Sequence, residues 1–161
     1  MLNIFKRTKE LNLIAPMSGT ISPLADVPDK VFATGMMGTG LAFNSADDTV
    51  LAPCAGKITV LPNTKHAFGI KTANDAEILV HIGLDTVNLQ GEGFTALVQQ
   101  GDKVQAGTPI IQLEREAITK KGYNLVTMLL ITNSSDYDVQ LTNNNSATGG
   151  ETQVAVVKNK D

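Results

Sequence analysis

The chain has 161 residues, of which 42% are hydrophobic and 18% are charged, and its formal net charge is −3. A chain of this size and composition forms one domain around a single core, which excludes a disordered protein. The slight acidity argues against a dedicated nucleic-acid binder, and no apolar run approaches the roughly 20 residues of a membrane-spanning helix.

Residues 1–12 differ in composition from the remainder and are expected to form a flexible N-terminal segment. Leu2, Ile4 and Phe5 stand beside basic residues, so peripheral contact of residues 1–9 with an anionic membrane surface is an alternative to a solvated terminus. The segment lacks the apolar core and cleavage site of a signal peptide. The single cysteine, Cys54, excludes an intramolecular disulfide. The lack of signal-peptide features and the single cysteine both predict a cytoplasmic protein.

From residue 13 onward the sequence predicts β structure, because short apolar runs alternate with glycine, proline and other turn residues. The expected strands lie at 13–14, 20–21, 49–52, 57–61, 68–71, 77–82, 109–113, 125–132 and 152–157. Many short strands at this spacing are typical of a sandwich or barrel. We therefore predict an all-β fold over residues 13–161, an antiparallel β-sandwich or barrel-like sandwich with one or two short helical turns.

The two helical turns are expected in the second half of the chain. Residues 94–100 end at Gly101, and residues 114–121 carry lysines in their last turn and end at Gly122, which is a pattern of helix C-termini. The polar residues 142–150 are expected to form a loop.

The only two histidines of the chain, His66 and His81, are the first candidates for chemistry near neutral pH. An antiparallel hairpin centred between Ala73 and Asn74 would place them directly opposite each other, with Cβ atoms about 4.5–5.5 Å apart. The alternation of side chains along a strand would then place Phe68 on the histidine face. A one-residue bulge would break this pairing.

Paired imidazoles suit two kinds of chemistry. They could ligate a metal, given a third ligand and an open position. Alternatively, one ring could be a nucleophile toward phosphorus while the other stabilises the transferring group. Thr64 precedes His66 by two residues and is placed to hold that ring through its hydroxyl. The residues alone leave both kinds of site open.

Several stretches around and between the histidines form a specific pattern: 15–19 (APMSG), 26–33 (DVPDKVFA), 37–40 (MGTG), 52–56 (APCAG), 64–67 (TKHA), 77–86 (EILVHIGLDT), 91–94 (GEGF) and 101–104 (GDKV). They closely resemble the glucose-family IIA domain of the bacterial phosphoenolpyruvate:sugar phosphotransferase system. The likeness covers about residues 12–157. It departs at 125–132, where Met128 stands at a position that is proline in many relatives.

The resemblance implies a β-sandwich whose shallow apolar depression holds both histidines. It implies a phosphotransferase component in which His81 accepts a phosphoryl group from the carrier protein HPr and passes it to a IIB cysteine, for sugar uptake and phosphorylation. His66 matches the auxiliary histidine that stabilises the phosphoryl group, and Thr64 matches its orienting partner. No cofactor is required, although some relatives bind zinc between the two histidines when a partner supplies a carboxylate.

Four further residues are candidates for partner docking. Asp29 and Phe32 match positions that border the depression, and Asp85 matches one beside the active histidine. Phe68 would extend an apolar docking patch if it were exposed. Each has an ordinary interpretation too, because aromatic residues mostly belong to the core and aspartates mostly to turns. Regulated transporters or kinases are further partners among relatives.

Two other classes of protein remain alternatives. Residues 15–21 and 101–107 look like the flanks of biotinyl or lipoyl carrier domains, but no lysine stands beside a methionine as such a carrier needs. A zinc-dependent hydrolase would need a third ligand, such as Asp85, and usually a His-x-His pair, which this chain lacks.

Overall fold

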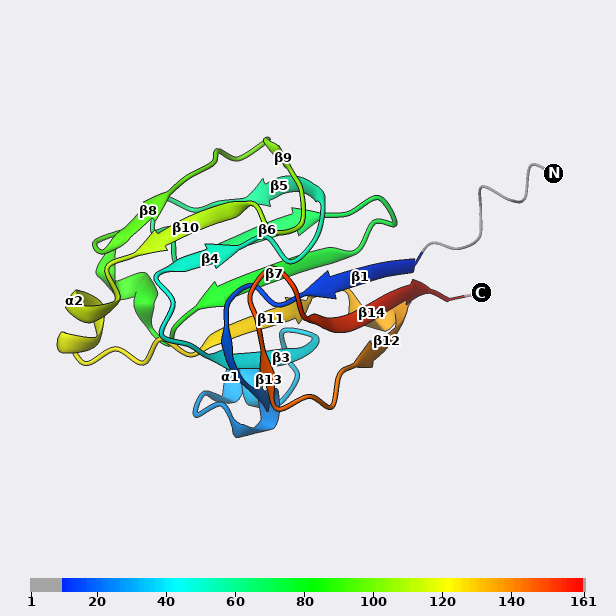
Figure 1. Cartoon of the computed structure of the whole chain (residues 1–161), viewed down its shortest axis with the longest axis horizontal. Coiled ribbons are helices and arrows are strands. Elements are labelled where there is room, and N and C mark those ends of the chain that lie inside the picture. Colours follow the sequence, from blue (N-terminus) through cyan, green and yellow to red (C-terminus); the bar gives the residue numbers. More distant parts are fainter. Residues whose placement is uncertain (1–9, 161) are drawn as a thin grey trace.

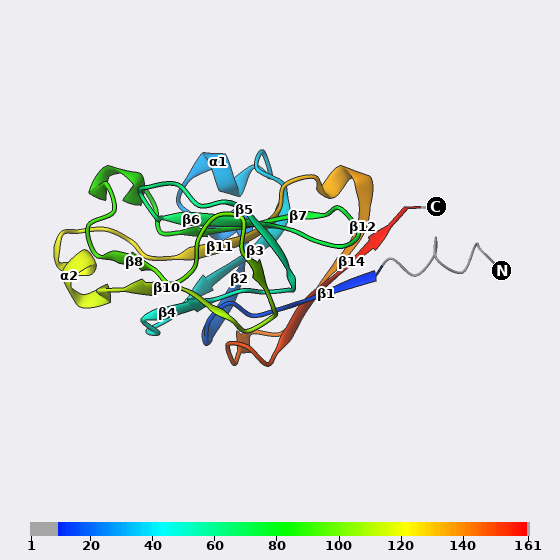
Figure 2. The ribbon, with the colours of Figure 1, turned by 90° about the horizontal axis from the view of Figure 1, so that it is seen from above.

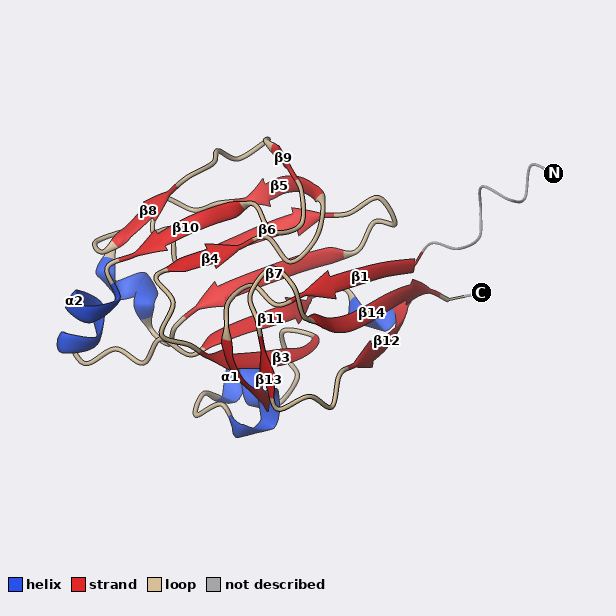
Figure 3. Cartoon of the chain, viewed as in Figure 1, coloured by secondary structure: helices blue, strands red, loops and turns tan. Residues whose placement is uncertain are grey.

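The computed structural model describes residues 10–160, which consist mainly of short strands joined by tight turns (Figures 1 and 3). The strands are β1 (Glu10–Ile14), β2 (Gly19–Pro23), β3 (Thr39–Asn44), β4 (Thr49–Leu51), β5 (Gly56–Val60), β6 (Ala67–Lys71), β7 (Glu77–Ile82), β8 (Phe94–Ala96), β9 (Lys103–Val104), β10 (Pro109–Leu113), β11 (Thr127–Ile131), β12 (Tyr137–Leu141), β13 (Ser146–Ala147) and β14 (Gln153–Asn159). The helices of this part are α1 (Lys30–Ala33), α2 (Arg115–Lys120) and 3-10 turns at Leu24–Asp26, Thr86–Leu89 and Ser134–Asp136.

Within these residues the strands pair into antiparallel sheets that stack in layers. The largest sheet has eight strands in the order β13-β2-β3-β11-β7-β6-β5-β9, and two three-stranded sheets have the orders β4-β10-β8 and β1-β14-β12. Figure 2 shows α1 over one face of the large sheet and β4 and β10 on its other side. The predicted antiparallel β-sandwich with short helical turns is confirmed.

The main core lies on the β4-β10 side of the large sheet. Phe43, Phe68, Ile82, Ile110 and Ile111 are all fully buried in it. Burial of each such side chain contributes about 1.5–3 kcal/mol relative to exposure, so this layer supplies most of the hydrophobic stabilisation. Cys54 belongs to the same core, and its burial raises the pKa of the thiol to about 12.

A second, smaller apolar cluster lies on the opposite face of the large sheet, beneath α1. Its members are Leu24, Val27, Phe32, Ala42, Leu84, Val126, Met128 and Leu130, with Met37 and Leu79 packed against it. Because side chains alternate along a strand, Val80 and Ile82 of β7 enter the main core while Leu79 and His81 point toward this cluster. The fold thereby places His81 on the α1 face.

The hairpin of β6 and β7 is paired one residue away from the expected register. Ala67, not His66, lies opposite His81. The turn between the two strands consists of the five residues 72–76. It is closed by a hydrogen bond from the Thr72 amide to the Ala76 carbonyl at 3.0 Å, and Asp75 within it has a left-handed conformation with φ of 64°. An odd-numbered turn centres the hairpin on a residue rather than on a peptide bond. The predicted direct pairing of the histidines is therefore wrong.

Several expected boundaries also change. Residues 10–12, assigned to the flexible segment, belong to β1 and pair with β14. Residues 94–100 do not form a helix, because Phe94 is buried in the main core and β8 pairs with β10. The expected loop at 142–150 contains the two-residue strand β13. The proposed membrane contact of residues 1–9 lies outside the described residues.

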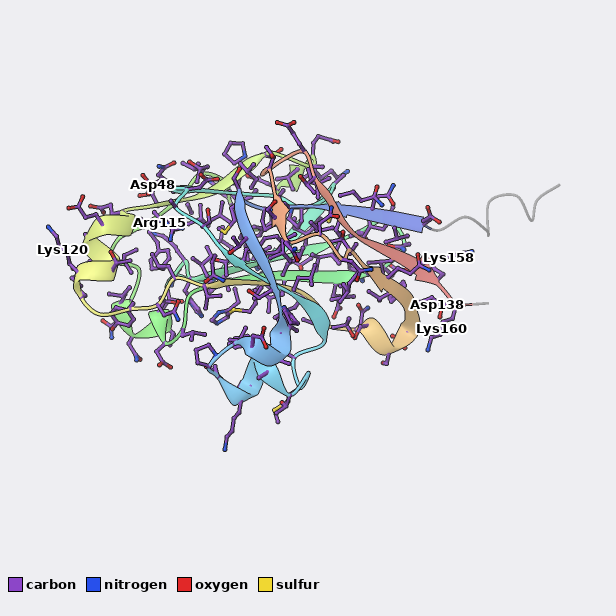
Figure 4. All side chains as sticks on the ribbon, turned by 60° about the horizontal axis from the view of Figure 1, so that its bottom comes forward. Asp48, Arg115, Lys120, Asp138, Lys158 and Lys160 are labelled. Carbon is purple, nitrogen blue, oxygen red and sulfur yellow. The ribbon has the colours of Figure 1, made fainter. Side chains whose placement is uncertain are left out.

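The second expected helix is confirmed as α2, at one end of the molecule. Figure 4 shows Asp48, Arg115 and Lys120 at this end and Asp138, Lys158 and Lys160 at the other. The Nε of Arg115 donates to the Asp47 carbonyl at 2.7 Å, which fastens α2 to the loop between β3 and β4. Among residues 10–160, none of the helices combines the length and hydropathy needed to span a bilayer.

Candidate functional site

His81 lies on β7 above an apolar floor. Its neighbours across the ladder are Ala67 of β6 and Met128 of β11, which are 6% and 0% exposed. His81 itself is half-buried, so part of its imidazole ring remains open to solvent. From the sequence, Met128 is notable only because many relatives have proline at this position. The pairing of β7 with β11 places Met128 directly beside His81 on the sheet.

His66 reaches His81 from a different direction than a regular hairpin would allow. It precedes β6, and Lys65 before it adopts a left-handed conformation with φ of 54°. The carbonyl of His66 accepts a hydrogen bond from the Ile82 amide at 2.7 Å, which ties this turn to the end of β7. The Thr64 hydroxyl lies 2.7 Å from Nδ1 of His66 and holds the ring.

The two imidazole rings meet edge to face. Their centroids are 5.1 Å apart, and their planes cross at 83°. On another side, the phenyl ring of Phe32 contacts His81 with centroids 4.8 Å apart and planes tilted by 54°. The predicted proximity of the histidines is therefore confirmed, although the turn before β6 produces it and the ladder register does not.

Both imidazoles are held in the neutral form by their surroundings. Burial lowers the pKa of His66 below its ordinary value of 6.5. Burial also lowers the pKa of His81, and together with the proximity of His66 brings it to about 4. The Gly83 backbone and the Asp29 carboxylate act in the opposite direction and are outweighed. Near neutral pH the pair therefore offers two uncharged rings with lone pairs.

One nitrogen of His81 is available to an external reactant. Its Nδ1 atom is buried and makes no hydrogen bond of standard geometry within the described residues, although it interacts with the Gly83 backbone. Because Nδ1 is closed to solvent while the residue is partly exposed, Nε2 is the nitrogen that an incoming group can reach. A neutral imidazole with a free Nε2 can bind a metal or attack an electrophile.

Asp29 stands at the start of α1 and has a structural task there. Its carboxylate accepts a hydrogen bond from the Val31 amide at 2.9 Å and so caps the helix that carries Phe32. Of its neighbours, Val31 is 43% exposed and Phe32 only 5% exposed. One turn of helix thus presents one apolar side chain to solvent and another to His81.

We expect Asp29→Ala to lower the free energy of unfolding by about 1 kcal/mol, because it removes the cap. Asp29→Asn keeps an acceptor oxygen and should retain most of the stability. It also removes a negative charge near His81 and should lower the pKa of that ring further. Urea denaturation and histidine titration by NMR measure both effects. An equal loss of stability in the two variants would contradict the capping role.

The other two candidate docking residues differ in position. Phe68 is fully buried in the main core, so its expected place on the histidine face is wrong and no partner can touch it on the surface. The one-residue shift of the hairpin register is the reason. Asp85 is exposed, with a left-handed φ of 59°, at the turn that follows β7.

The histidine pair by itself provides two metal ligands. In the part of the chain that the structure describes, no three His, Cys, Asp or Glu side chains come together as a metal site. A catalytic zinc ordinarily has three protein ligands, so these residues fit zinc only if another molecule completes the coordination.

Comparison with known proteins gives a consistent result. The chain matches the family described as phosphoenolpyruvate-dependent sugar phosphotransferase system, EIIA 1, over residues 11–137. A glucose-specific EIIA component of Oceanobacillus iheyensis is 41% identical over 162 residues, with 98% of each protein covered. A glucose-specific EIICBA component of Staphylococcus saprophyticus is 38% identical over 155 residues, which are 96% of this chain and 23% of that protein.

A solved structure shows the same fold. The chain superposes on glucose permease IIA from Mycoplasma capricolum with a TM-score of 0.87 and 37% identity, over 92% of this chain and 96% of that one. These matches give no support to the hydrolase or the biotinyl and lipoyl alternatives. The chain belongs to the EIIA 1 family of the phosphoenolpyruvate-dependent sugar phosphotransferase system and is a phosphocarrier of that system.

Proposed function

We propose that His81 is the residue that carries the phosphoryl group, which it takes from phospho-HPr and passes to a cysteine of a IIB domain. One observation supports this assignment above the others: the only two histidines of the chain meet edge to face, 5.1 Å apart, on an apolar and partly open surface. His81 is the better acceptor of the two because its Nε2 keeps its lone pair, whereas a hydrogen bond from the Thr64 hydroxyl to Nδ1 of His66 places the hydrogen of that ring on Nε2.

The acceptance step needs only this ring and an incoming phosphoryl donor. The Nε2 lone pair of His81 forms a bond to phosphorus while the bond from phosphorus to the donor breaks, and that electron pair stays on the donor. The proton on Nδ1 remains inside the protein, where the Gly83 backbone faces it. Phosphoryl transfer depends mostly on positioning and electrostatics, which a fixed, neutral ring supplies.

His66 supports the transferring group. If the Thr64 hydroxyl donates to Nδ1 of His66, the hydrogen of that neutral ring is on Nε2, which can then donate to a phosphoryl oxygen. Negative charge on the phosphoryl group favours protonation of a nearby imidazole, so His66 can also take a second proton as the group arrives. Its edge-to-face placement is suited to such a role.

Thr64→Val should reduce phosphoryl transfer to the IIB domain about fivefold, because a hydrogen bond of about 1 kcal/mol that fixes the His66 tautomer is lost. Thr64→Ser is the matched control and should keep the wild-type rate, since it retains the hydroxyl. Nitrogen chemical shifts of the His66 ring should show a mixed tautomer only in the valine variant. Equal rates for valine and wild type would contradict the orienting role.

The partners follow from the family and from its relatives. One relative joins the corresponding domain to further parts in an EIICBA protein, which agrees with a IIB domain as the acceptor. Because the relatives are named glucose-specific, we assign glucose as the sugar. The proposed docking residues are Asp29, Asp85 and the exposed Val31. Phosphoryl transfer between these partners is proposed to take place in the cytoplasm.

The test of this function is reconstitution with labelled phosphoenolpyruvate, enzyme I and HPr. We expect one phosphoryl group per chain, labile to acid and stable to base, that appears only with HPr and leaves when a IIB domain is added. A chelator should not change the result. Absence of label, or a label that is stable to acid, would overturn the proposal. Labelling that requires zinc would favour the metal-dependent alternative instead.

A further inference from the structure

Phe32 stands out among the apolar residues near the histidines because it is almost fully buried. It is 5% exposed, whereas Val31 beside it is 43% exposed and Met36 is 75% exposed. Its ring lies against the imidazole of His81, with centroids 4.8 Å apart. At 5% exposure Phe32 offers a partner little surface, so its contact with His81 calls for another explanation.

The His81 ring depends on packing for its orientation. His66 is held by the Thr64 hydroxyl at 2.7 Å, but Nδ1 of His81 interacts with the Gly83 backbone without a hydrogen bond of standard geometry in the described part of the chain. A ring without a strong hydrogen bond on one nitrogen keeps its angle only if its neighbours fill the space around it. The neighbours of His81 are His66, Met128 on the sheet and Phe32 above.

Phe32 is itself fixed firmly enough to act on another residue. Asp29 caps α1 and its carbonyl accepts from the Ala33 amide at 2.9 Å, which closes the helical turn. The phenyl ring belongs to the apolar cluster under α1 that includes Leu24, Val27 and Met128. The helix thus holds the phenyl ring in contact with the imidazole.

From this geometry we propose that Phe32 is a positioning residue for phosphoryl acceptance, which holds the His81 ring at the angle that presents Nε2 and keeps water from its covered face. The proposal rests on the proposed function, in which His81 is the acceptor. Two adjacent residues of α1 then have different roles: Phe32 positions the imidazole of His81, and Val31 contacts the partner protein.

A small phosphoryl donor separates these tasks, because it needs no docking surface. With phosphoramidate, the donor's phosphorus–nitrogen bond breaks, ammonia leaves, and phosphorus bonds to Nε2 of His81. Phe32→Leu should lower this rate about tenfold, and Phe32→Tyr, which keeps the ring, should restore it. Val31→Ala should raise the KM for phospho-HPr, and Met36→Ala, at an exposed residue with no role in the proposal, should leave the phosphoramidate rate unchanged.

Titration of His81 by NMR is the second readout. Phe32→Leu should raise the pKa of His81 toward its ordinary value, because water reaches the ring, while Val31→Ala should not. In the wild-type protein, cross-relaxation between the Phe32 and His81 ring protons should be strong, and this measurement needs no variant to fold. A Phe32→Leu variant that is slow only with HPr would make Phe32 a docking residue and overturn the inference, as would absent cross-relaxation. Failure of phospho-HPr to label wild-type His81 would instead reject the proposed function.

Discussion

Replacement of His81 by glutamine is expected to abolish phosphoryl acceptance from phospho-HPr, to below about one thousandth of the wild-type rate, because the nucleophile itself is removed. Glutamine is similar in size to histidine and sits here on a floor of Ala67 and Met128, so the sheet should keep its packing. Incorporation of labelled phosphate per chain measures the loss directly. The small donor phosphoramidate should fail as well, since the proposal places a hydrogen on Nε2 of His66 and leaves that nitrogen no lone pair to attack phosphorus.

The control for this prediction is the other histidine. His66→Gln should still accept label from HPr, which shows that loss of an imidazole in general is not the cause. If His81→Gln incorporated phosphate normally and His66→Gln did not, the two roles would have to be exchanged.

The pH dependence of acceptance reports the same assignment. The folded-state pKa of His81 is lowered from 6.5 to about 4, so the neutral ring persists well below neutral pH. Acceptance in the wild type should therefore stay constant from pH 8 to about 5 and fall only as the pH approaches 4. An unperturbed histidine would lose half its reactive form near pH 6.5. A rate that halves at that pH would contradict the buried environment of the ring.

The lowered pKa of His81 also makes a signed contribution to folding. The unfolded chain binds a proton on His81 more tightly than the folded protein does, because the pKa of this ring is about 6.5 in the unfolded chain and about 4 in the folded one. The free energy of unfolding therefore decreases as the pH falls below 6.5. The contribution, up to about 3 kcal/mol, is complete above pH 6.5 and is lost as the pH falls toward 4. His81→Gln should flatten this part of the stability curve, which denaturant titrations at several pH values would reveal.

His66→Gln should separate acceptance from onward transfer. We expect acceptance from HPr within a few-fold of wild type and transfer to the IIB cysteine lowered by about 10²–10⁴-fold, the range of a lost acid–base group. A glutamine amide can donate a hydrogen bond to a phosphoryl oxygen, but it cannot take up and release a second proton. Rapid-quench measurement of the two half-reactions distinguishes the steps.

Two outcomes would remove His66 from this role. If both half-reactions kept the wild-type rate, the 5.1 Å contact between the rings would have no part in transfer. If both fell equally, His66 would act on acceptance and departure alike, and its proton would not be specific to the onward step. Thr64→Val should resemble a weaker form of His66→Gln, because it disturbs the same ring.

Strands could be predicted from the sequence where an apolar run is bounded by turn residues. The strand predicted at 77–82 matches β7, and the C-terminal helix signal at Gly122 correctly marked α2. The strand β3 gave no such signal, because Gly40 through Phe43 are buried on both faces and show no alternation. Residues 94–100 look helical locally, but burial of Phe94 against β10 decided their conformation.

The histidine pair was predictable, and its exact geometry was not. Counting residues across a turn fixes the pairing register only to within one residue. The hairpin is centred on Asn74 rather than between Ala73 and Asn74, in a turn where Asp75 is left-handed, and this shifts the pairing by one residue. The same shift buried Phe68 in the main core. Phe32 could not be assigned from sequence, because its contact with His81 depends on how the four residues of α1 dock on the sheet.

Locating the phosphoryl group in the wild-type protein tests most directly whether His81 is the acceptor. After reaction with phosphoenolpyruvate, enzyme I and HPr, phosphorus–nitrogen coupling in NMR spectra identifies the modified ring and the modified nitrogen. We expect a single phosphohistidine, at Nε2 of His81, with the neighbouring His66 ring unmodified. A phosphoryl group on His66, or on Nδ1 of His81, would contradict it.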